Sequence, residues 1–527
     1  MRHSASILLR IIVCLALLTG CGAARQDDFA PSVTILHTND VHGAFSALDP
    51  LSGKPAGGVI GHDRIAAVRA AYAARGDTVF LLDAGDATQG IYFVGQSRGE
   101  AAIAIMNAAG YDAMTLGNHE FDYGWPRLLE LMAMADFSIL SQLDDDPARQ
   151  AEDLHPFILI ERNGARLGVF GITTPETSFQ SDGGFGRDFG DMPAIIARAQ
   201  KTVDLLRGPE KADYVICLAH LGVEDTGYGT SYDLRDAVRG IDLIIDGHSH
   251  TALADIANPP GTTPITSTGS GGKGLGIASL RQSAAGVAVA LETMDRDAAM
   301  AFDPDPATGA VIALWGERVA EEGREVVAVV PFAVSVDRGF ERTRETVMGD
   351  IVTDAMRAVS GADIAMQNGG GIRDQELAAG AVTKAQLITI LPFGNIVRMA
   401  EVKGSVILEC LELGVSAYPA EHGGFMQVSG LKYRFNPGLP GGSRVTSVTV
   451  GGKVLDPDAV YTVCTNDFIA AGGDRFTMLA EPFSTQLPLR NPGLASLEEA
   501  LIWYLGAYRD VLPAAPQGRI VAEQPVK

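Results

Sequence analysis

Val33-Thr34-Ile35-Leu36-His37-Thr38-Asn39-Asp40-Val41-His42-Gly43 is the stretch of this sequence that decides the fold. Its first part, Val33–Leu36, is mostly apolar, which is typical of a strand that is covered on both faces. Its second part places Asp40 and His42 directly after that strand. In open α/β sheets the functional site lies beyond the carboxyl ends of the strands. The stretch therefore predicts a strand that carries polar side chains to a site.

The same arrangement recurs through the first half of the chain. Further apolar runs predict strands at Thr78–Leu82, Leu167–Ile172, Tyr214–Leu218 and Ile241–Ile245. Helical patterns alternate with them at Arg64–Ala74, Gly99–Ala109, Trp125–Ala135 and Met192–Arg207. Strands that alternate with helices predict a layered α/β domain.

The second half is set apart by a change of composition. Asp303-Pro304-Asp305-Pro306 precedes a predicted charged helix, Ala310–Glu322, which we interpret as a connector between domains. A peripheral helix of the first domain is the alternative. Beyond it, Val326–Val336 is apolar and a second α/β region follows. The predicted organisation is a leader at 1–21, a first domain at 32–302, a linker helix at 303–323 and a smaller domain at 324–523.

The N-terminus has the features of an export signal. Arg2 and Arg10 flank a basic start, and the apolar run Ile11–Leu18 is too short to span a bilayer. It ends in Leu18-Thr19-Gly20-Cys21, which resembles the lipobox of bacterial lipoproteins. The resemblance implies an exported protein, facing the periplasm, that is attached to the membrane only by lipid on Cys21. An ordinary secretory signal with an incidental cysteine is the alternative.

The composition excludes several classes of protein. The 527 residues include 41 basic and 64 acidic side chains, a formal charge of −23, which becomes −25 if residues 1–20 with their two arginines are removed. Such a chain is unsuited to binding a nucleic-acid polymer, which requires clustered Lys and Arg. With 46% hydrophobic residues it is globular, and its length predicts more than one domain. Only Cys217, Cys410 and Cys464 follow Cys21, so it is no disulfide scaffold.

A series of candidate metal ligands follows the predicted strands or lies in glycine-containing turns. They are Asp40, His42, Asp86, Asn118, His220, His248 and His250. Carboxylate oxygen and imidazole nitrogen suit Mn²⁺, Zn²⁺ or Fe²⁺. Each motif alone is weak evidence, because Asp-x-His occurs by chance, but the ordered set predicts a metal centre.

The ordered set resembles the calcineurin-like metallophosphoesterases and, within them, the 5′-nucleotidase/UDP-sugar hydrolase family. The motifs that carry the resemblance are Leu36–Gly43, Gly85–Gly90, Gly117–Asp122 and Gly247–Thr251. The resemblance implies a four-layer α/β-β/α sandwich that is joined by a helix to a smaller α/β substrate-binding domain. It also implies two divalent metal ions, Mn²⁺ or Zn²⁺.

The resemblance assigns ligands to each metal. One ion would be bound by Asp40, His42, Asp86 and His250, and the other by Asp86, Asn118, His220 and His248. A shared carboxylate can hold two metal ions about 3.5–4 Å apart, which suits in-line displacement at phosphorus. One departure lies after the last motif, where many relatives carry Gln-Ala-Gly and this chain has Ser267-Thr268-Gly269. It puts in doubt only supporting contacts near the metals.

His119 and Asp122 are a candidate catalytic pair. Their i, i+3 spacing allows them to meet on a helical turn, and the resemblance implies that Asp122 orients His119 in catalysis. The alternative is that Asp122 caps the helix that begins near Trp125. We interpret Asp83 and Glu120 as supporting residues. Four further histidines are interpreted as structural: His37, His62, His155 and His422.

The second half contains three motifs that predict a nucleotide pocket, Gln367–Arg373, Leu391–Asn395 and Thr465–Phe476. A glycine triplet before an arginine allows close backbone approach to an anion, and two phenylalanines can sandwich a base. The resemblance implies that Phe393 and Phe468 stack on the base and that Asp474 holds the ribose. Asn368, Arg373 and either Arg342 or Arg344 would contact the nucleotide, with Arg342 favoured.

The expected activity is hydrolysis of nucleoside 5′-monophosphates, and the sequence leaves open whether UDP-sugars are also substrates. Enzymatic alternatives on the same scaffold are a 2′,3′-cyclic nucleotide phosphodiesterase and a thiosulfohydrolase-like enzyme. The second needs no base sandwich, so the two phenylalanines argue against it. A solute-binding lipoprotein is the non-enzymatic alternative, but it would not need clustered metal ligands. The oligomeric state stays open.

Overall fold

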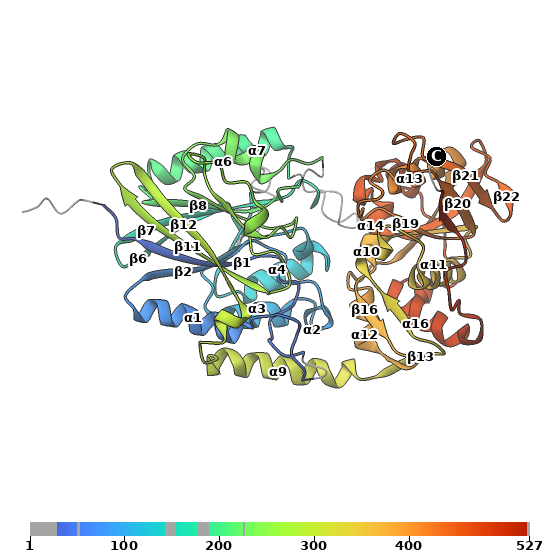
Figure 1. Cartoon of the computed structure of the whole chain (residues 1–527), viewed down its shortest axis with the longest axis horizontal. Helices are drawn as coiled ribbons and strands as arrows, with labels where there is room; N and C mark the ends of the chain where they lie inside the picture. The colour runs from blue at the N-terminus through green and yellow to red at the C-terminus, as the bar shows by residue number, and fades with distance from the viewer. Residues whose placement is uncertain (1–28, 50–52, 143–153, 178–188, 225–226, 524–527) are drawn as a thin grey trace, which may run out of the picture.

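The protein consists of two α/β halves joined by a long helix (Figure 1). A computed structural model describes residues 29–49, 53–142, 154–177, 189–224 and 227–523. The predicted leader and Cys21 lie outside the described residues. Among the described residues, none of the helices is long and apolar enough to cross a bilayer.

Two sheets form the N-terminal half. The first has the order β12-β11-β1-β2-β3-β4-β5 and the second has the order β10-β9-β8-β7-β6. The strands of the first sheet are β1 (Val33–Thr38), β2 (Thr78–Asp83), β3 (Ala113–Thr115), β4 (Ser138–Leu140), β5 (Leu154–His155), β11 (Gly274–Ser283) and β12 (Gly286–Asp295). Those of the second are β6 (Phe157–Arg162), β7 (Ala165–Thr173), β8 (Tyr214–His220), β9 (Leu243–Asp246) and β10 (Ile265–Thr266). The strands β1 to β5 are parallel, so their carboxyl ends share one edge.

The two sheets pack face to face and helices cover their outer faces. Ile35 and Phe80 of the first sheet and Tyr214 of the second are fully buried in one cluster between the sheets. Burying an apolar side chain of this size stabilises the fold by about 1.5–3 kcal/mol. The helices α1 (His62–Ala74), α2 (Tyr92–Gly95), α3 (Glu100–Ala109) and α4 (Trp125–Met134) contribute to the core on the first sheet. Helices α6 (Met192–Arg207) and α7 (Ser231–Ala237) cover the second. The predicted four-layer sandwich is confirmed.

Helix α9 (Pro306–Gly323) leads from one half to the other, along the lower edge of Figure 1. Asp305 caps its N-terminus by accepting from the Thr308 N–H, and a proline occupies its first turn. Ile312 and Val319 are buried in the core of the N-terminal half, and the helix also contacts α12 (Lys384–Ile390) of the C-terminal half. The helix is therefore a packed part of the first half that also contacts the second.

The C-terminal half is built on two four-stranded sheets. One has the order β18-β23-β15-β19 and the other β22-β21-β20-β24. Their strands are β15 (Ile364–Asn368), β18 (Val397–Lys403), β19 (Met426–Ser429), β20 (Leu431–Phe435), β21 (Val445–Val450), β22 (Lys453–Val454), β23 (Val460–Asn466) and β24 (Ile520–Ala522). Two short pairs join β13 (Val326–Val330) to β17 (Gly380–Thr383) and β14 (Val334–Val336) to β16 (Gln375–Leu377).

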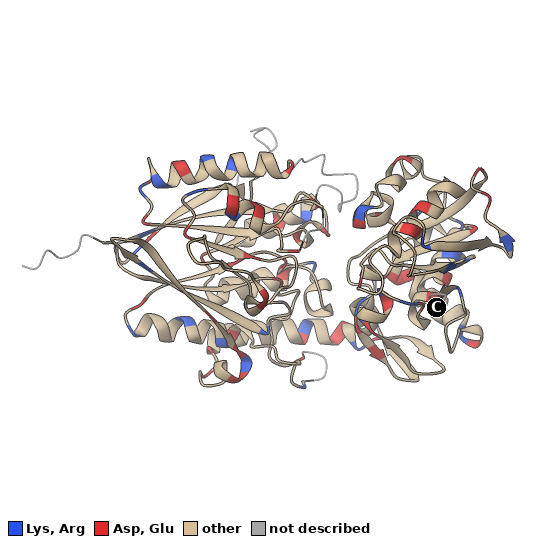
Figure 2. Cartoon of the chain, turned by 45° about the horizontal axis from the view of Figure 1, so that its top comes forward, with Lys and Arg blue, Asp and Glu red and all other residues tan. Residues whose placement is uncertain are grey.

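Helices complete this half. Helix α11 (Val347–Ser360) packs on β15 and β19 and against α16 (Leu497–Ala507), and α13 (Gly404–Gly414) packs on β18 and β21. The shorter helices include α8 (Arg296–Ala299) in the N-terminal half and α10 (Arg338–Glu341), α14 (Asp467–Ala470) and α15 (Ala480–Phe483) here. The smaller α/β domain expected from the sequence is confirmed. Acidic and basic residues are interspersed along the helices of both halves (Figure 2).

Candidate active site

The seven predicted metal ligands lie at or just beyond the carboxyl ends of the strands, as the sequence pattern indicates. Asp40 and His42 follow β1, Asp86 follows β2, Asn118 follows β3, and His220 ends β8. The remaining two, His248 and His250, follow β9. Because the strands are parallel, these loops meet at one edge of the two sheets.

The backbone at this edge is unusually strained. Ten non-glycine residues of the described chain have positive φ, and five of them are predicted ligands: Asp40, His42, Asp86, His248 and His250. Each such residue costs of the order of 1–3 kcal/mol, and such residues concentrate at functional sites. Gly85, at φ 93°, provides the turn that directs Asp86 inward.

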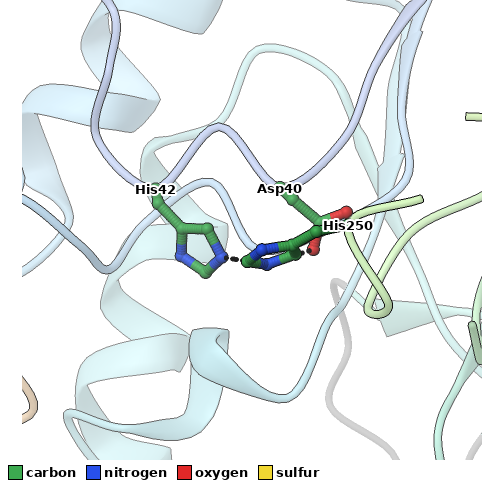
Figure 3. Close-up of side chains that lie close together, drawn as sticks. All are labelled: Asp40, His42 and His250. Carbon is green, nitrogen blue, oxygen red and sulfur yellow. Dashed lines mark hydrogen bonds and ion pairs between the residues drawn. The ribbon is translucent and has the colours of Figure 1, made fainter. Parts of the chain in front are cut away.

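Asp40, His42 and His250 form the first group of donor atoms (Figure 3). The Nε2 atoms of His42 and His250 lie 3.1 Å apart, and His250 Nε2 lies 3.5 Å from Asp40 Oδ1. Burial lowers the pKa of His42 to about 3 and the pKa of His250 to about 2. Both rings are therefore neutral at pH 7, the form in which imidazole binds a metal ion.

Asp86 lies between this group and a second one. Its Oδ2 atom is 3.7 Å from His42 Nε2 and 3.2 Å from His220 Nε2. The donor atoms of Asp40, Asp86 and His220 also lie within 4.8 Å of one another, so Asp40 is close to both groups. The position of Asp86 suits a carboxylate that bridges two ions, the role that the resemblance implies for it.

Asn118 brings the last two candidate ligands into the second group. Its Oδ1 atom lies 3.2 Å from His220 Nε2 and 2.9 Å from His248 Nδ1. Burial lowers the pKa of His220, but the charge of Asp86 and a hydrogen bond with it raise that pKa to about 10. The negative charge that holds a proton on the buried His220 ring would also attract a divalent cation. The residues therefore fit a two-metal site.

Supporting contacts that the sequence did not single out hold these ligands. Glu176 Oε2 lies 3.1 Å from His248 Nε2, which leaves His248 Nδ1 facing Asn118. Glu176 follows β7, so the rule that located the other residues at strand ends also applies to it. A carboxylate behind a ligating histidine fixes the orientation of its ring.

The segment Ser267–Gly269, which differs from the Gln-Ala-Gly of many relatives, also supports a ligand. Asn39 Nδ2 donates to Ser267 Oγ and to the Gly269 carbonyl, and Asn39 Oδ1 accepts from the Thr268 N–H. The same Asn39 amide donates to Asp40 Oδ2 at 2.7 Å. The segment therefore supports Asp40 through Asn39, which answers the doubt that its sequence raised.

His119 and Asp122 meet as the i, i+3 spacing predicts. His119 Nδ1 donates to Asp122 Oδ2 at 2.7 Å, and the His119 backbone N–H donates to Asp86 Oδ1. Burial lowers the pKa of His119, but the charges of Asp122 and Asp86 outweigh it and raise that pKa to about 9. The N-cap of α4 is Gly124, so Asp122 is not the cap residue of that helix. The raised pKa and the hydrogen bond with Asp122 suit His119 to the role of a proton donor.

A cleft of about 970 Å³ lies between the two halves, within the size range of small-ligand sites. From the N-terminal half it is lined by Asp86, Asn118, His119, Asp122, His248 and His250. From the C-terminal half all six predicted substrate residues line it: Arg342, Asn368, Arg373, Phe393, Phe468 and Asp474. The other three predicted ligands, Asp40, His42 and His220, are not among its lining residues, and Asp40 and His220 are fully buried.

A ring contact across the cleft connects the two halves, and further contacts order the cleft residues of the C-terminal half. The ring of Phe393 stacks on His119 with centroids 5.4 Å apart, and the Arg373 guanidinium lies 4.9 Å from the centre of the Phe393 ring. Asn368 Nδ2 donates to Asp474 Oδ2 at 2.8 Å. Burial, with like charges nearby, lowers the pKa of Arg373 to about 9 and the pKa of Arg342 to about 10. These crowded cations favour binding of an anion.

The structure distinguishes between the two candidate upstream arginines. Arg342 lines the cleft, whereas the Arg344 guanidinium lies 3.9 Å from the centre of the Phe340 ring, and neither Arg344 nor Phe340 lines the cleft. Arg338 also lines the cleft, although the sequence did not single it out. Arg338 lies four residues before Arg342, and this i, i+4 spacing could have predicted that the two side chains lie on the same side of a helical turn. His422, which we interpreted as structural, lies on the cleft wall as well.

Comparisons with known proteins agree with this geometry. Residues 33–252 match the family model of the calcineurin-like phosphoesterases, and residues 326–481 match that of the 5′-nucleotidase C-terminal domain. The 5′-nucleotidase of Diplobatis ommata is 31% identical over 512 residues, which cover 88% of this chain and 86% of that protein. This chain belongs to the 5′-nucleotidase family. It is a 5′-nucleotidase-type phosphohydrolase, and the non-enzymatic alternative is excluded.

Two further relatives are similar to this chain over most of its length. The solved 5′-nucleotidase precursor of Thermus thermophilus is 32% identical, with a TM-score of 0.74, covering 94% of this chain and all of that one. The trifunctional nucleotide phosphoesterase YfkN of Bacillus subtilis is 30% identical over 497 residues, or 85% of this chain. This chain spans only 32% of the length of YfkN.

Proposed function

We propose that this 5′-nucleotidase-type phosphohydrolase acts on nucleoside 5′-monophosphates and releases nucleoside and phosphate. The observation that carries the proposal is that Asp86, His248, His250 and His119 line the same cleft as four residues of the C-terminal half, Arg342, Arg373, Phe393 and Phe468. The first set has the chemistry for a phosphoryl group, and the second has the chemistry for an anion that is attached to a planar base.

The proposed cofactors are two divalent ions, Mn²⁺ or Zn²⁺. Asp40, His42, Asp86 and His250 would bind one ion, and Asp86, Asn118, His220 and His248 the other. When bound, such ions lower the pKa of a water molecule and neutralise charge on phosphoryl oxygens. The chain itself supplies the neutral imidazoles of His42 and His250, and Glu176 and Asn39 hold two of the ligands in place.

The remaining cleft residues would bind and orient the substrate. Asp122 holds His119 by its Nδ1–H, so that the charged ring can stabilise the phosphoryl group and donate a proton to the leaving 5′-oxygen. Arg342 and Arg373 would pair with the phosphate. Asn368 would also contact the nucleotide, and Asp474 would accept from the ribose hydroxyls. Phe393 and Phe468 would stack on the base, which a thiosulfohydrolase would not need.

A pair of arginine variants tests the part of this proposal that concerns the C-terminal half. Arg342→Ala should raise KM for AMP about ten-fold or more, because a charge-assisted hydrogen bond contributes roughly 1.5–3 kcal/mol. Arg344→Ala is the matched control, since its guanidinium packs on Phe340 outside the cleft lining. Steady-state kinetics with AMP measure both effects. Equal changes in KM for the two variants would contradict the assignment.

We also propose that the mature protein is anchored to the cell envelope by lipid on Cys21, facing the periplasm. The support is the sequence alone: a basic start, a short apolar run and a lipobox-like Leu18-Thr19-Gly20-Cys21. Mass spectrometry of the mature N-terminus should find an acylated cysteine at position 21. A mature chain that begins elsewhere, or an unmodified Cys21, would contradict the anchor.

A further inference from the structure

Glu120 adjoins His119 in the sequence but serves a different part of the molecule. It lies in the 3₁₀ turn His119–Phe121, is 1% exposed, and is not among the residues that line the cleft. Its carboxylate accepts five hydrogen bonds. Oε2 accepts from the N–H groups of Asp86 at 2.8 Å and Gly117 at 2.7 Å, and Oε1 accepts from Ala87 N–H at 2.8 Å, Thr88 N–H at 3.0 Å and Thr88 Oγ1 at 3.1 Å.

These donors belong to two different loops. Residues 86–88 follow β2 and include Asp86, the proposed shared ligand, whereas Gly117 follows β3 and directly precedes Asn118. Three successive N–H groups at 86–88 form a concave binding site for an anion, and Glu120 fills it with a carboxylate of the chain itself. The oxygen Oε2 binds both loops, so one atom sets the distance between them.

The loop after β2 needs such a contact to keep its shape. Gly85 and Asp86 have φ values of 93° and 60°, and a residue other than glycine persists in this region only where its surroundings hold it. The contact between Asp86 and Glu120 involves the Asp86 backbone, which leaves the Asp86 carboxylate free to face His220. Glu120 therefore acts on the orientation of Asp86 and does not compete for its oxygens.

We propose that Glu120 is a positioning residue that joins the loop of Asp86 to the loop of Asn118 and so sets the spacing of the two groups of metal ligands. The inference rests on the two-metal site of the proposed function. Glutamine cannot replace Glu120 here, because its amide offers one acceptor oxygen and its NH₂ group would face the N–H donors.

The test is metal binding by Glu120→Gln in the full chain, by titration of the metal-free protein with Zn²⁺ or Mn²⁺ against a competing chelator. We expect about 10–100-fold weaker binding of at least one ion, the effect typical of losing a residue that orients metal ligands. The absorption spectrum of the Co²⁺-loaded variant should also shift, which a loss of stability alone would not cause.

Asp112→Asn is the matched control, because Asp112 directly precedes β3 and joins it to β2 without contacting the two loops that Glu120 joins. It accepts from the Leu81 N–H at 2.9 Å and pairs with Arg162 at 2.6 Å. This variant should lose thermal stability while it keeps wild-type metal affinity. If both variants lose metal affinity equally, the effect is general destabilisation and the proposal fails.

Further outcomes separate this inference from the proposed function. Wild-type metal affinity with an unchanged Co²⁺ spectrum in Glu120→Gln would overturn the positioning role alone. A wild-type protein that binds no divalent ion would overturn the two-metal site itself. If Glu120→Gln does not fold, Thr88→Val removes one of the five donors and should weaken metal binding about two- to five-fold. Unchanged affinity in that variant would overturn the proposal.

Discussion

Replacing Asp86 with alanine will lower kcat/KM for AMP by about four orders of magnitude or more. Asp86 Oδ2 lies 3.7 Å from His42 Nε2 and 3.2 Å from His220 Nε2, so this carboxylate lies between a histidine of each donor group. Its removal deprives both proposed ions of a negatively charged ligand. A loss of four orders of magnitude in kcat/KM corresponds to about 5.5 kcal/mol of transition-state stabilisation. Metal analysis of the purified variant should find fewer than two ions per chain.

The control for Asp86→Ala is Asp242→Asn. Asp242 is a partly buried aspartate that pairs with Arg207 and accepts from the Val215 N–H, and it is not among the residues that line the cleft. Its variant should keep both ions and most activity. An Asp86→Ala protein that retains two ions per chain and normal turnover would show that Asp86 does not bridge a metal pair.

Replacing His119 with alanine should lower the rate of catalysis strongly while it leaves metal binding intact. We expect kcat for AMP to fall about 10²–10⁴-fold, the usual contribution of a positioned proton donor. The metal content should stay at two ions, because the bond from the His119 backbone N–H to Asp86 Oδ1 survives the substitution. Metal analysis and AMP kinetics on the same preparation test both expectations.

Asp122→Ala provides the comparison for His119→Ala. Asp122 acts through its 2.7 Å hydrogen bond with His119, so its loss should lower kcat less than the loss of the ring itself. A larger loss in Asp122→Ala than in His119→Ala, or the loss of metal from His119→Ala, would mean that the roles of the pair are misassigned.

The sequence predicted those parts of the site that follow from local rules. The strands at Val33–Leu36 and Tyr214–Leu218 were recognisable from their apolar runs, and the residues directly after them are ligand candidates because strand ends meet at one edge. The pair His119 and Asp122 follows from helical spacing, which is also local. The roles of these residues in metal binding and catalysis came from the resemblance to the 5′-nucleotidase family.

Contacts between distant loops were not predictable in this way. Glu176 meets His248 although 72 residues separate them, and Asn39 meets Thr268 across 229 residues. The choice of Arg342 over Arg344 depends on which side chain faces the cleft and which packs on Phe340, and sequence spacing does not determine that. Similarly, the antiparallel pairing of β11 with β1 joins segments from opposite ends of the first half.

In the proposed function, two metal ions and residues of both halves act on one nucleotide. The most direct test is titration of the metal-free protein with Mn²⁺ or Zn²⁺ while phosphate release from AMP is followed, with UDP-glucose and 2′,3′-cyclic AMP in parallel. We expect AMP hydrolysis to be absent without metal, to rise with added ions and to saturate at two ions per chain. A protein that holds two ions and leaves AMP intact, or hydrolyses AMP equally well without metal, would contradict it.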